Sequence, residues 1–195
     1  MTGVTVKHIA RALGAALFLS IVALPAALPA LADTPLAGEA APEFRLQDQD
    51  SEWHSLADYQ GNWVALYFYP KADTPGCTTE ACAFRDDIFA FRKLGVTVIG
   101  VSLDDVKSQK EFAEKYSLPF PLLSDRGKET AKSYGVFRKY GPIGIAVRET
   151  FLIDPEGRVG KHYDKVNPDK HSQQVLADLA TLMQTAAEEA AQPDG

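Results

Sequence analysis

Residues 70–82 read PKADTPGCTTEAC, and this stretch contains both cysteines of the 195-residue chain, Cys77 and Cys82. The most apolar strand-like run, Trp63 to Tyr69, comes directly before it. After it, apolar residues recur at every third or fourth position, which is the spacing of one helical face. The stretch therefore predicts a strand-to-helix junction that carries both thiols.

The predicted helix has start and stop signals. Thr74 followed by Pro75 is typical of an N-cap residue and the first helical position. Gly76 and Cys77 then fall in the first turn. The apolar spacing continues as one helix up to Gly95, which is expected in the left-handed conformation that ends a helix.

The first turn is a place where a thiolate is favoured. Its backbone N–H groups have no partner within the helix, and the positive end of the helix dipole lies there. Both features stabilise an anion, so the Cys77 thiol is expected to lose its proton readily and to act as a nucleophile. Glu80, which follows closely, is interpreted as an acid that complements the dipole.

The composition is that of an ordinary globular domain. Hydrophobic residues make up 46% and charged residues 24% of the chain, and the formal net charge is −6 with no run of like charges. A chain of this length can bury a core as a single domain. Nucleic-acid binding is not expected, because it requires a cluster of lysine and arginine residues.

Residues 1–32 differ from the rest of the chain. A short basic region precedes an almost wholly apolar run, Ala12 to Ala27, and Ala30-Leu31-Ala32 has the pattern of a signal peptidase site. We expect a cleaved signal peptide. The alternative is an uncleaved membrane anchor, because the apolar run approaches the ~20 residues that span a bilayer. Cleavage leaves residues 33–195 with a net charge of −8, because two basic residues and no acid are removed. We expect this domain in a bacterial periplasm, as a monomer without stable membrane association.

Two cysteines in an exported protein usually form a structural disulfide. A bridge between Cys77 and Cys82 would close so small a loop that it would add little stability. The four histidines lie far apart in the sequence, at His8, His54, His162 and His171. Because a metal site needs about four ligands, we expect no metal and no other cofactor. The two cysteines are interpreted as a redox pair.

The remaining pattern predicts a mixed sheet between helices. Alternating residues around Phe44–Leu46 and Trp53–Leu56 indicate a hairpin. Trp63–Tyr69 and Val96–Val101 flank the cysteine helix as a right-handed βαβ unit. The pattern further predicts helices over 104–116, 125–134 and 169–189, strands over 122–123, 146–153 and 158–163, and a loop over 140–144. This is the element order of an α/β fold, a thioredoxin-like sandwich with an N-terminal β-hairpin extension.

The stretch around Cys77 resembles a known family. Pro70-x-x-x-Thr74-x-x-Cys77 is similar to the peroxidatic motif of the peroxiredoxins. The strings that resemble their Q type, the bacterioferritin-comigratory-protein branch, are Tyr67 to Cys82, Phe120-Pro-Leu-Leu-Ser-Asp125 and Arg148-Glu-Thr-Phe-Leu-Ile-Asp154. The resemblance spans about Leu36 to Leu182, nearly the whole of the mature chain.

The resemblance implies a thiol-dependent peroxidase. Cys77 would be the peroxidatic cysteine, which hydrogen peroxide or an organic hydroperoxide oxidises to a sulfenic acid. Cys82 would be the resolving cysteine, which converts this acid to an intramolecular disulfide. A thioredoxin-like donor would restore the dithiol. The resemblance also places Thr74, Arg148 and Pro70 in the site.

These implied roles agree with the chemistry. Attack of a thiolate on a peroxide spreads negative charge over sulfur and oxygen, and Arg148 offers a permanent cation for it. The backbone N–H groups of Gly76 and Cys77 can bind the peroxide oxygen, and the Thr74 hydroxyl can donate to sulfur or peroxide. Each of these side chains could instead have a purely structural role. Arg148 could form an ordinary ion pair, Thr74 could serve as an N-cap, and Pro70 could end a strand.

Two other functions are alternatives. A thioredoxin-like protein disulfide oxidoreductase would share the fold, but it uses Cys-x-x-Cys, whereas four residues separate Cys77 from Cys82. A redox sensor or holdase that uses the same two thiols is the second alternative.

Overall fold

We describe the computed structural model of the chain over residues 1–3 and 34–191. The predicted signal peptide lies outside this part apart from its first three residues, so its cleavage stays a prediction. Among the described residues, no helix has the length and apolar character needed to cross a membrane.

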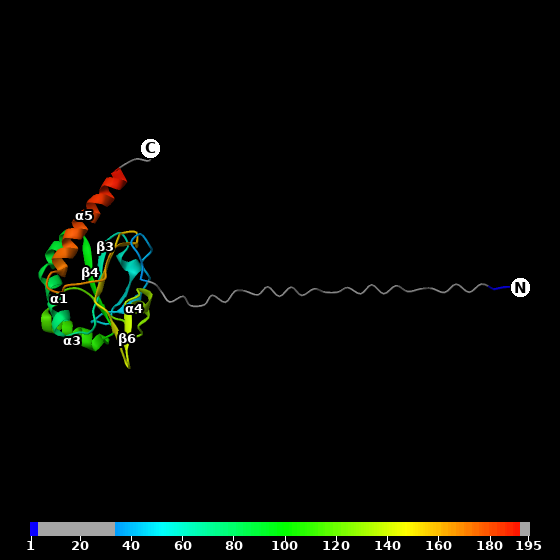
Figure 1. Ribbon diagram of the computed structural model, residues 1–195, viewed down its shortest axis with the longest axis horizontal. Coiled ribbons are helices and arrows are strands. Elements are labelled where there is room, and N and C mark those ends of the chain that lie inside the picture. The colour runs from blue at the N-terminus through cyan, green and yellow to red at the C-terminus, as the bar shows by residue number, and fades with distance from the viewer. Residues whose placement is uncertain (4–33, 192–195) are drawn as a thin grey trace. The chain divides into compact units, whose positions relative to one another are not determined.

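A mixed sheet of seven strands forms the centre of the described fold (Figure 1). In spatial order the strands are β2 (Trp53–Ser55), β1 (Arg45–Gln47), β5 (Leu122–Ser124), β4 (Val96–Ser102), β3 (Trp63–Phe68), β8 (Glu149–Ile153) and β9 (Val159–Tyr163). β3, β4 and β5 are parallel, and the other neighbouring strands are antiparallel. This arrangement confirms the predicted mixed sheet, the βαβ unit and the N-terminal hairpin of β1 and β2.

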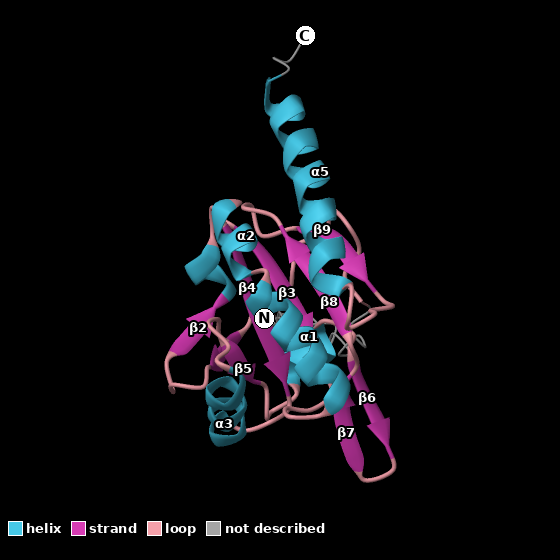
Figure 2. Ribbon diagram, turned by 90° about the vertical axis from the view of Figure 1, so that its left-hand side faces the viewer, coloured by secondary structure: helices cyan, strands magenta, loops and turns pink. Residues whose placement is uncertain are grey.

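Helices cover both faces of the sheet (Figure 1), and Figure 2 looks onto one of these two covered faces. One face carries α1 (Pro75–Asp86), α2 (Ile88–Lys93), α3 (Val106–Tyr116) and α5 (His171–Ala191), and the other carries α4 (Glu129–Ser133) and the 3-10 turn η1 (Leu56–Tyr59). Alternate residues of β3 enter the two cores. Ala65 and Tyr67 pack on the α1 side, and Leu66 and Phe68 pack on the α4 side. Because all of β3 is buried, it is the doubly covered strand that its apolar sequence predicts.

The prediction of one helix from the cysteines to Gly95 is wrong, because α1 and α2 meet at Asp87. This residue has φ −92° and ψ 2°, outside the helical range. Its carboxylate accepts hydrogen bonds from the side chains of Ser172 at 2.7 Å and Gln173 at 2.6 Å, at the start of α5. A contact with a distant part of the sequence thus interrupts a helix whose apolar spacing continues. Gly95 has φ +70° after α2, as predicted.

The segment after α4 also differs from the prediction. Residues 140–144, predicted as a loop, contain the turn of a separate antiparallel pair, β6 (Phe137–Tyr140) and β7 (Ile143–Ala146). The predicted strand over 146–153 is divided, because β7 pairs with β6 and β8 pairs with β3. Arg148 lies at this division, from which its side chain reaches α1. The remaining predicted elements are present with shifted ends.

Candidate active site

The loop between β3 and α1 fixes where α1 begins. Asp73 has a left-handed backbone conformation with φ +57°, which is uncommon for a residue other than glycine. At the end of α3, Lys115 Nζ donates to both carboxylate oxygens of Asp73 at 2.7 and 2.8 Å, and the Tyr116 hydroxyl donates at 2.7 Å. The Asp104 carboxylate accepts a hydrogen bond from the Ala72 N–H at 2.7 Å. These contacts set the direction of the first turn of α1.

Thr74 and Pro75 begin α1 as predicted. Thr74 has the extended backbone angles of an N-cap residue, and its carbonyl accepts a hydrogen bond from the Thr78 N–H at 2.8 Å. Its hydroxyl donates to the Lys71 carbonyl at 2.8 Å and makes no capping hydrogen bond, so the alternative of a side-chain N-cap does not hold. Contact of this hydroxyl with a peroxide stays a prediction. Pro70 is half-buried just after β3 ends.

The Cys77 sulfur lies beside a guanidinium group. Cys77 is in the first turn of α1 and is only 2% exposed. Nη2 of Arg148 lies 3.2 Å from its Sγ atom. Gly76 permits this approach, because a Cβ atom at that position would lie 3.2 Å from the same Nη2. The structure therefore brings together three of the residues named from the sequence.

Glu80 belongs to this site. The interpretation that it only complements the helix dipole is incomplete, because its main contact is with Arg148. Its side chain is fully buried, and its carboxylate forms an ion pair with Nη1 of Arg148. Burial raises the pKa of Glu80 to about 7, against the opposing effect of Arg148. The sequence offered one signal for this placement: Glu80 comes three residues after Cys77 and shares its helix face.

Aromatic side chains close the inner side of the site. Tyr67 stacks on Phe84 with ring centroids 4.9 Å apart, and both rings are fully buried. Burial raises the pKa of Tyr67 well above its usual value, so its hydroxyl stays neutral. His171 packs edge-on against Phe84 at 5.7 Å, and burial lowers its pKa to about 4. Charge near the thiol therefore comes from Arg148 and Glu80 rather than from these rings.

Cys82 lies on the same helix as Cys77 but outside bonding reach. Both cysteines are free thiols in α1, and Cys82 is partly exposed. In an intact helix, residues five positions apart differ by ~140° around the axis, with Cα atoms roughly 8 to 9 Å apart. A disulfide needs a Cα separation below about 7 Å. The reduced structure therefore keeps the two thiols apart.

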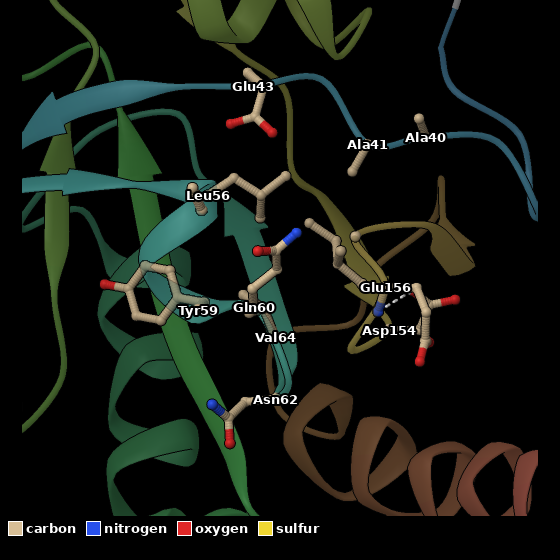
Figure 3. Close-up of a pocket in the computed structure, with 13 residues that line it drawn as sticks. Ala40, Ala41, Glu43, Leu56, Tyr59, Gln60, Asn62, Val64, Asp154 and Glu156 are labelled. Carbon is tan, nitrogen blue, oxygen red and sulfur yellow. Dashed lines mark hydrogen bonds between the residues drawn. The ribbon is translucent and has the colours of Figure 1, made fainter.

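A separate pocket, drawn in Figure 3, has a volume of about 150 Å³. Its wall includes Leu56, Val64 and Ile153, which belong to the core on the α4 side of the sheet, whereas Cys77 belongs to the core on the α1 side. The pocket adds nothing to the thiol site. The described part of the chain also gathers no group of three or more histidine, cysteine or carboxylate side chains that could hold a metal ion.

Comparisons with known proteins agree on one family. The sequence pattern of the AhpC/TSA family matches residues 37–162. The chloroplastic peroxiredoxin Q of Oryza sativa subsp. japonica is 46% identical over 147 residues, which cover 74% of this chain and 67% of the rice protein.

Solved structures give the same picture. Peroxidoxin BcpB from Mycobacterium tuberculosis superimposes with a TM-score of 0.71 at 35% identity, covering 75% of this chain and 97% of that one. The bacterioferritin comigratory protein of Xanthomonas campestris, reported with alkyl peroxide reduction activity, gives 0.67 at 34% identity, covering 71% and 90%. These similarities confirm the predicted thioredoxin-like sandwich.

Proposed function

This chain belongs to the AhpC/TSA family and is a thiol-dependent peroxidase of the peroxiredoxin Q type, and on that premise we propose that Cys77 is its peroxidatic cysteine and Cys82 its resolving cysteine. The observation that carries the assignment is the 3.2 Å contact between Cys77 Sγ and Arg148 Nη2. A thiol beside a cation and at a helix N-terminus is readily held as the thiolate. Arg148 is therefore placed to stabilise negative charge on the sulfur during the reaction.

In the first step, the Cys77 thiolate attacks the terminal oxygen of a hydroperoxide. The S–O bond forms while the O–O bond breaks, and sulfur gives up two electrons. The leaving alkoxide, or hydroxide from hydrogen peroxide, takes up a proton. Arg148 and the first-turn N–H groups of Gly76 and Cys77 stabilise the negative charge that spreads over the oxygens. Thr74 donates a further hydrogen bond once its hydroxyl turns away from the Lys71 carbonyl.

In the second step, the Cys82 thiolate attacks the sulfur of the Cys77 sulfenic acid. The S–S bond forms, the S–O bond breaks, and hydroxide leaves and is protonated to water. A dithiol donor of the thioredoxin type then reduces the disulfide by thiol–disulfide exchange. Pro70, at the end of β3, shields the sulfenic acid from solvent during this sequence.

Both hydrogen peroxide and organic hydroperoxides are the proposed substrates. The similar Xanthomonas campestris protein, reported with alkyl peroxide reduction activity, supports the organic class.

Peroxide consumption by the purified protein tests this proposal, with thioredoxin, thioredoxin reductase and NADPH as the electron source. We expect turnover by the wild type and none by Cys77→Ser, whose circular dichroism spectrum should be unchanged. Turnover by Cys77→Ser would overturn the assignment. Reduction of insulin disulfides by the wild type without peroxide would instead favour the disulfide oxidoreductase alternative.

Export is a separate part of the proposal. The basic start, the apolar run and the Ala30-Leu31-Ala32 pattern support a cleaved signal peptide and a periplasmic location, and we propose a monomer there. Protein isolated from its host should begin near Asp33, appear in the soluble periplasmic fraction and elute at the mass of one chain. An intact Met1 in a membrane fraction would show that the leader is an anchor.

A further inference from the structure

The last two residues of α3, Lys115 and Tyr116, hold Asp73 just before α1 begins. Lys115 Nζ donates to both carboxylate oxygens of Asp73 at 2.7 and 2.8 Å, and the Tyr116 hydroxyl donates to Oδ1 at 2.7 Å. We call these three hydrogen bonds the latch. The latch joins the end of α3 to the start of α1, the helix that carries both cysteines.

The α3 side of the latch is anchored in the core. The Tyr116 ring packs edge-on against Phe112 with ring centroids 5.4 Å apart, and the buried Phe112 packs against Tyr69 at 6.0 Å. Lys115 Nζ lies 5.1 Å from the centroid of the Tyr116 ring, within the range of a cation–π attraction. The two donors are therefore held in place independently of α1.

The Asp73 side of the latch belongs to the segment that has to move. Its left-handed backbone conformation, with φ +57°, turns the chain into Thr74 and the first turn of α1, and it is unfavourable for most residues that have a Cβ atom. Because Cys77 and Cys82 cannot bond while α1 is intact, disulfide formation has to unwind this turn. Unwinding releases the backbone conformation that places the Asp73 carboxylate against α3, so the latch and the first turn form and break together.

We propose that Lys115 and Tyr116 are positioning residues, which hold the first turn of α1 closed through Asp73 and so set how fast Cys82 resolves the Cys77 sulfenic acid. The inference rests on the proposed function, and it adds a control of the resolving step from α3. Cys82 attacks only from the open form, so the rate of disulfide formation is proportional to the open fraction. The latch lowers this fraction.

The latch also affects a competing oxidation. While α1 stays closed, the Cys77 sulfenate lies beside Arg148 and can attack a second hydroperoxide. A second S–O bond forms as the O–O bond breaks, sulfur gives up two electrons, and the leaving alkoxide takes the proton of the transferred oxygen. The product is a sulfinic acid, which Cys82 cannot convert to a disulfide. The latch therefore sets how much Cys77 is lost to over-oxidation.

Two substitutions weaken the latch from the α3 side. Tyr116→Phe removes one hydrogen bond and keeps the ring, and Lys115→Met removes the ion pair and keeps an apolar side chain. Lys110→Met is the matched control, because Lys110 Nζ, also on α3, binds Asp50 between β1 and β2 at 3.0 Å. The two lysine side chains are about equally exposed, at 50% for Lys110 and 56% for Lys115. The control thus removes a comparable ion pair that joins α3 to another segment.

Single-turnover oxidation separates the two chemical steps. After one equivalent of hydrogen peroxide, quenched samples analysed by mass spectrometry give the fractions of sulfenic acid and disulfide. We expect the double variant Lys115→Met/Tyr116→Phe to form the disulfide about three- to tenfold faster, because an exposed ion pair and a hydrogen bond no longer oppose opening. Oxidation of Cys77 should stay within about twofold of the wild-type rate, since the closed form still predominates. Lys110→Met should match the wild type in both steps. An unchanged disulfide rate in the double variant, or a first step slowed severalfold, would overturn the proposal.

Two further measurements distinguish a latch from general support of the fold. With excess peroxide, the double variant should need about three- to tenfold more peroxide to convert half of Cys77 to sulfinic acid. In the reduced protein, amide exchange should speed up across about Thr74 to Arg85 and stay unchanged in β4. Equally faster exchange in β4 would show that the whole fold is weakened, and would overturn the proposal.

Asp73→Asn tests the latch from its other side, because asparagine also tolerates the left-handed conformation but carries no charge. It should speed disulfide formation, and adding Lys115→Met should change the rate little further, because both substitutions remove the same ion pair. Fully additive effects would show that the two residues act separately and would overturn the latch. Failure of the proposed function is distinguishable, because the wild type itself would then form no disulfide between Cys77 and Cys82.

Discussion

The carboxylate of Glu80 forms a buried ion pair with the guanidinium of Arg148, at the point where Arg148 reaches the Cys77 sulfur. Glu80 is fully buried, and its second carboxylate oxygen has no hydrogen-bond partner among the described residues. A buried carboxylate is costly unless it is paired. The pair therefore fixes the guanidinium so that its other nitrogen points at the thiol.

Loss of the Glu80 charge should misplace Arg148. We expect Glu80→Gln to lower the second-order rate constant for oxidation of Cys77 by roughly ten- to a hundredfold, because small misplacements of a catalytic group have effects of this size. Stopped-flow measurement with hydrogen peroxide gives this constant. Glu111→Gln is the control, since within the described part of the chain this exposed acid of α3 pairs only with Lys107, at 3.6 Å. An unchanged constant in Glu80→Gln would show that Arg148 keeps its place unaided.

Removal of the cation should affect the first step more strongly. Arg148→Met is expected to slow oxidation of Cys77 by about 10² to 10³, the effect of losing one preorganised group that stabilises developing charge. Alkylation of Cys77 at neutral pH should slow as well. Arg138→Met is the control, because among the described residues Arg138 bonds only to the backbone carbonyls of Gly135 and Phe137. Oxidation and alkylation of Cys77 at wild-type rates in Arg148→Met would contradict the role assigned to Arg148.

His171 should make the fold sensitive to acid. Its Nε2 shares a hydrogen bond with the Thr150 hydroxyl at 2.8 Å, and burial lowers its pKa from 6.5 to about 4. The unfolded chain then binds a proton more tightly than the folded chain, so the stability is fully present above about pH 6.5 and falls as the pH approaches 4. The loss amounts to at most about 3 kcal/mol.

Urea unfolding between pH 7 and pH 4 measures this loss. His171→Gln should be less stable than the wild type at pH 7, because the packing of the ring is lost, but its free energy of unfolding should fall less steeply with acid. His54→Gln provides the comparison, since His54 is half-buried at the surface beside Asp48. Equal slopes for the wild type and His171→Gln would show that His171 is not the group that titrates.

The parts of the site that lie close together in the chain could be predicted from the sequence. The Thr74-Pro75 signal and the apolar spacing after Cys77 depend only on neighbouring residues. In the structure, α1 begins at these two residues and carries this apolar face, as predicted. Arg148 is different. Its contact with Cys77 depends on the division between β7 and β8, which no spacing rule indicates, so only the family resemblance could name it.

The prediction of a single helix up to Gly95 and the interpretation of Glu80 as a dipole-complementing acid fail for the same physical reason. The helix is interrupted at Asp87 because Ser172 and Gln173 bind its carboxylate, and Glu80 is buried because Arg148 neutralises it. Helical periodicity shows which residues share a face, but it cannot show that a distant residue will supply the partner for an acid. Contacts of this kind override local propensity.

The last prediction concerns the motion of α1. Because Cys77 and Cys82 cannot bond while the helix is intact, oxidation should unwind its first turns. Gly76 and the threonines that follow Cys77 are poor helix formers, which lowers the cost of this opening. The Asp87 carboxylate, bound to the start of α5, should stop the unwinding before α2.

Amide hydrogen exchange can follow this opening residue by residue. In the oxidised protein, exchange should speed up across about Thr74 to Arg85, while α2 and β4 stay protected because neither carries a cysteine. Cys82→Ser should react with one equivalent of peroxide at the normal rate, then stall and over-oxidise at Cys77, because no thiol reaches the sulfenic acid. If the oxidised wild type instead keeps α1 protected as in the reduced protein, the two cysteines do not form the proposed disulfide within one chain.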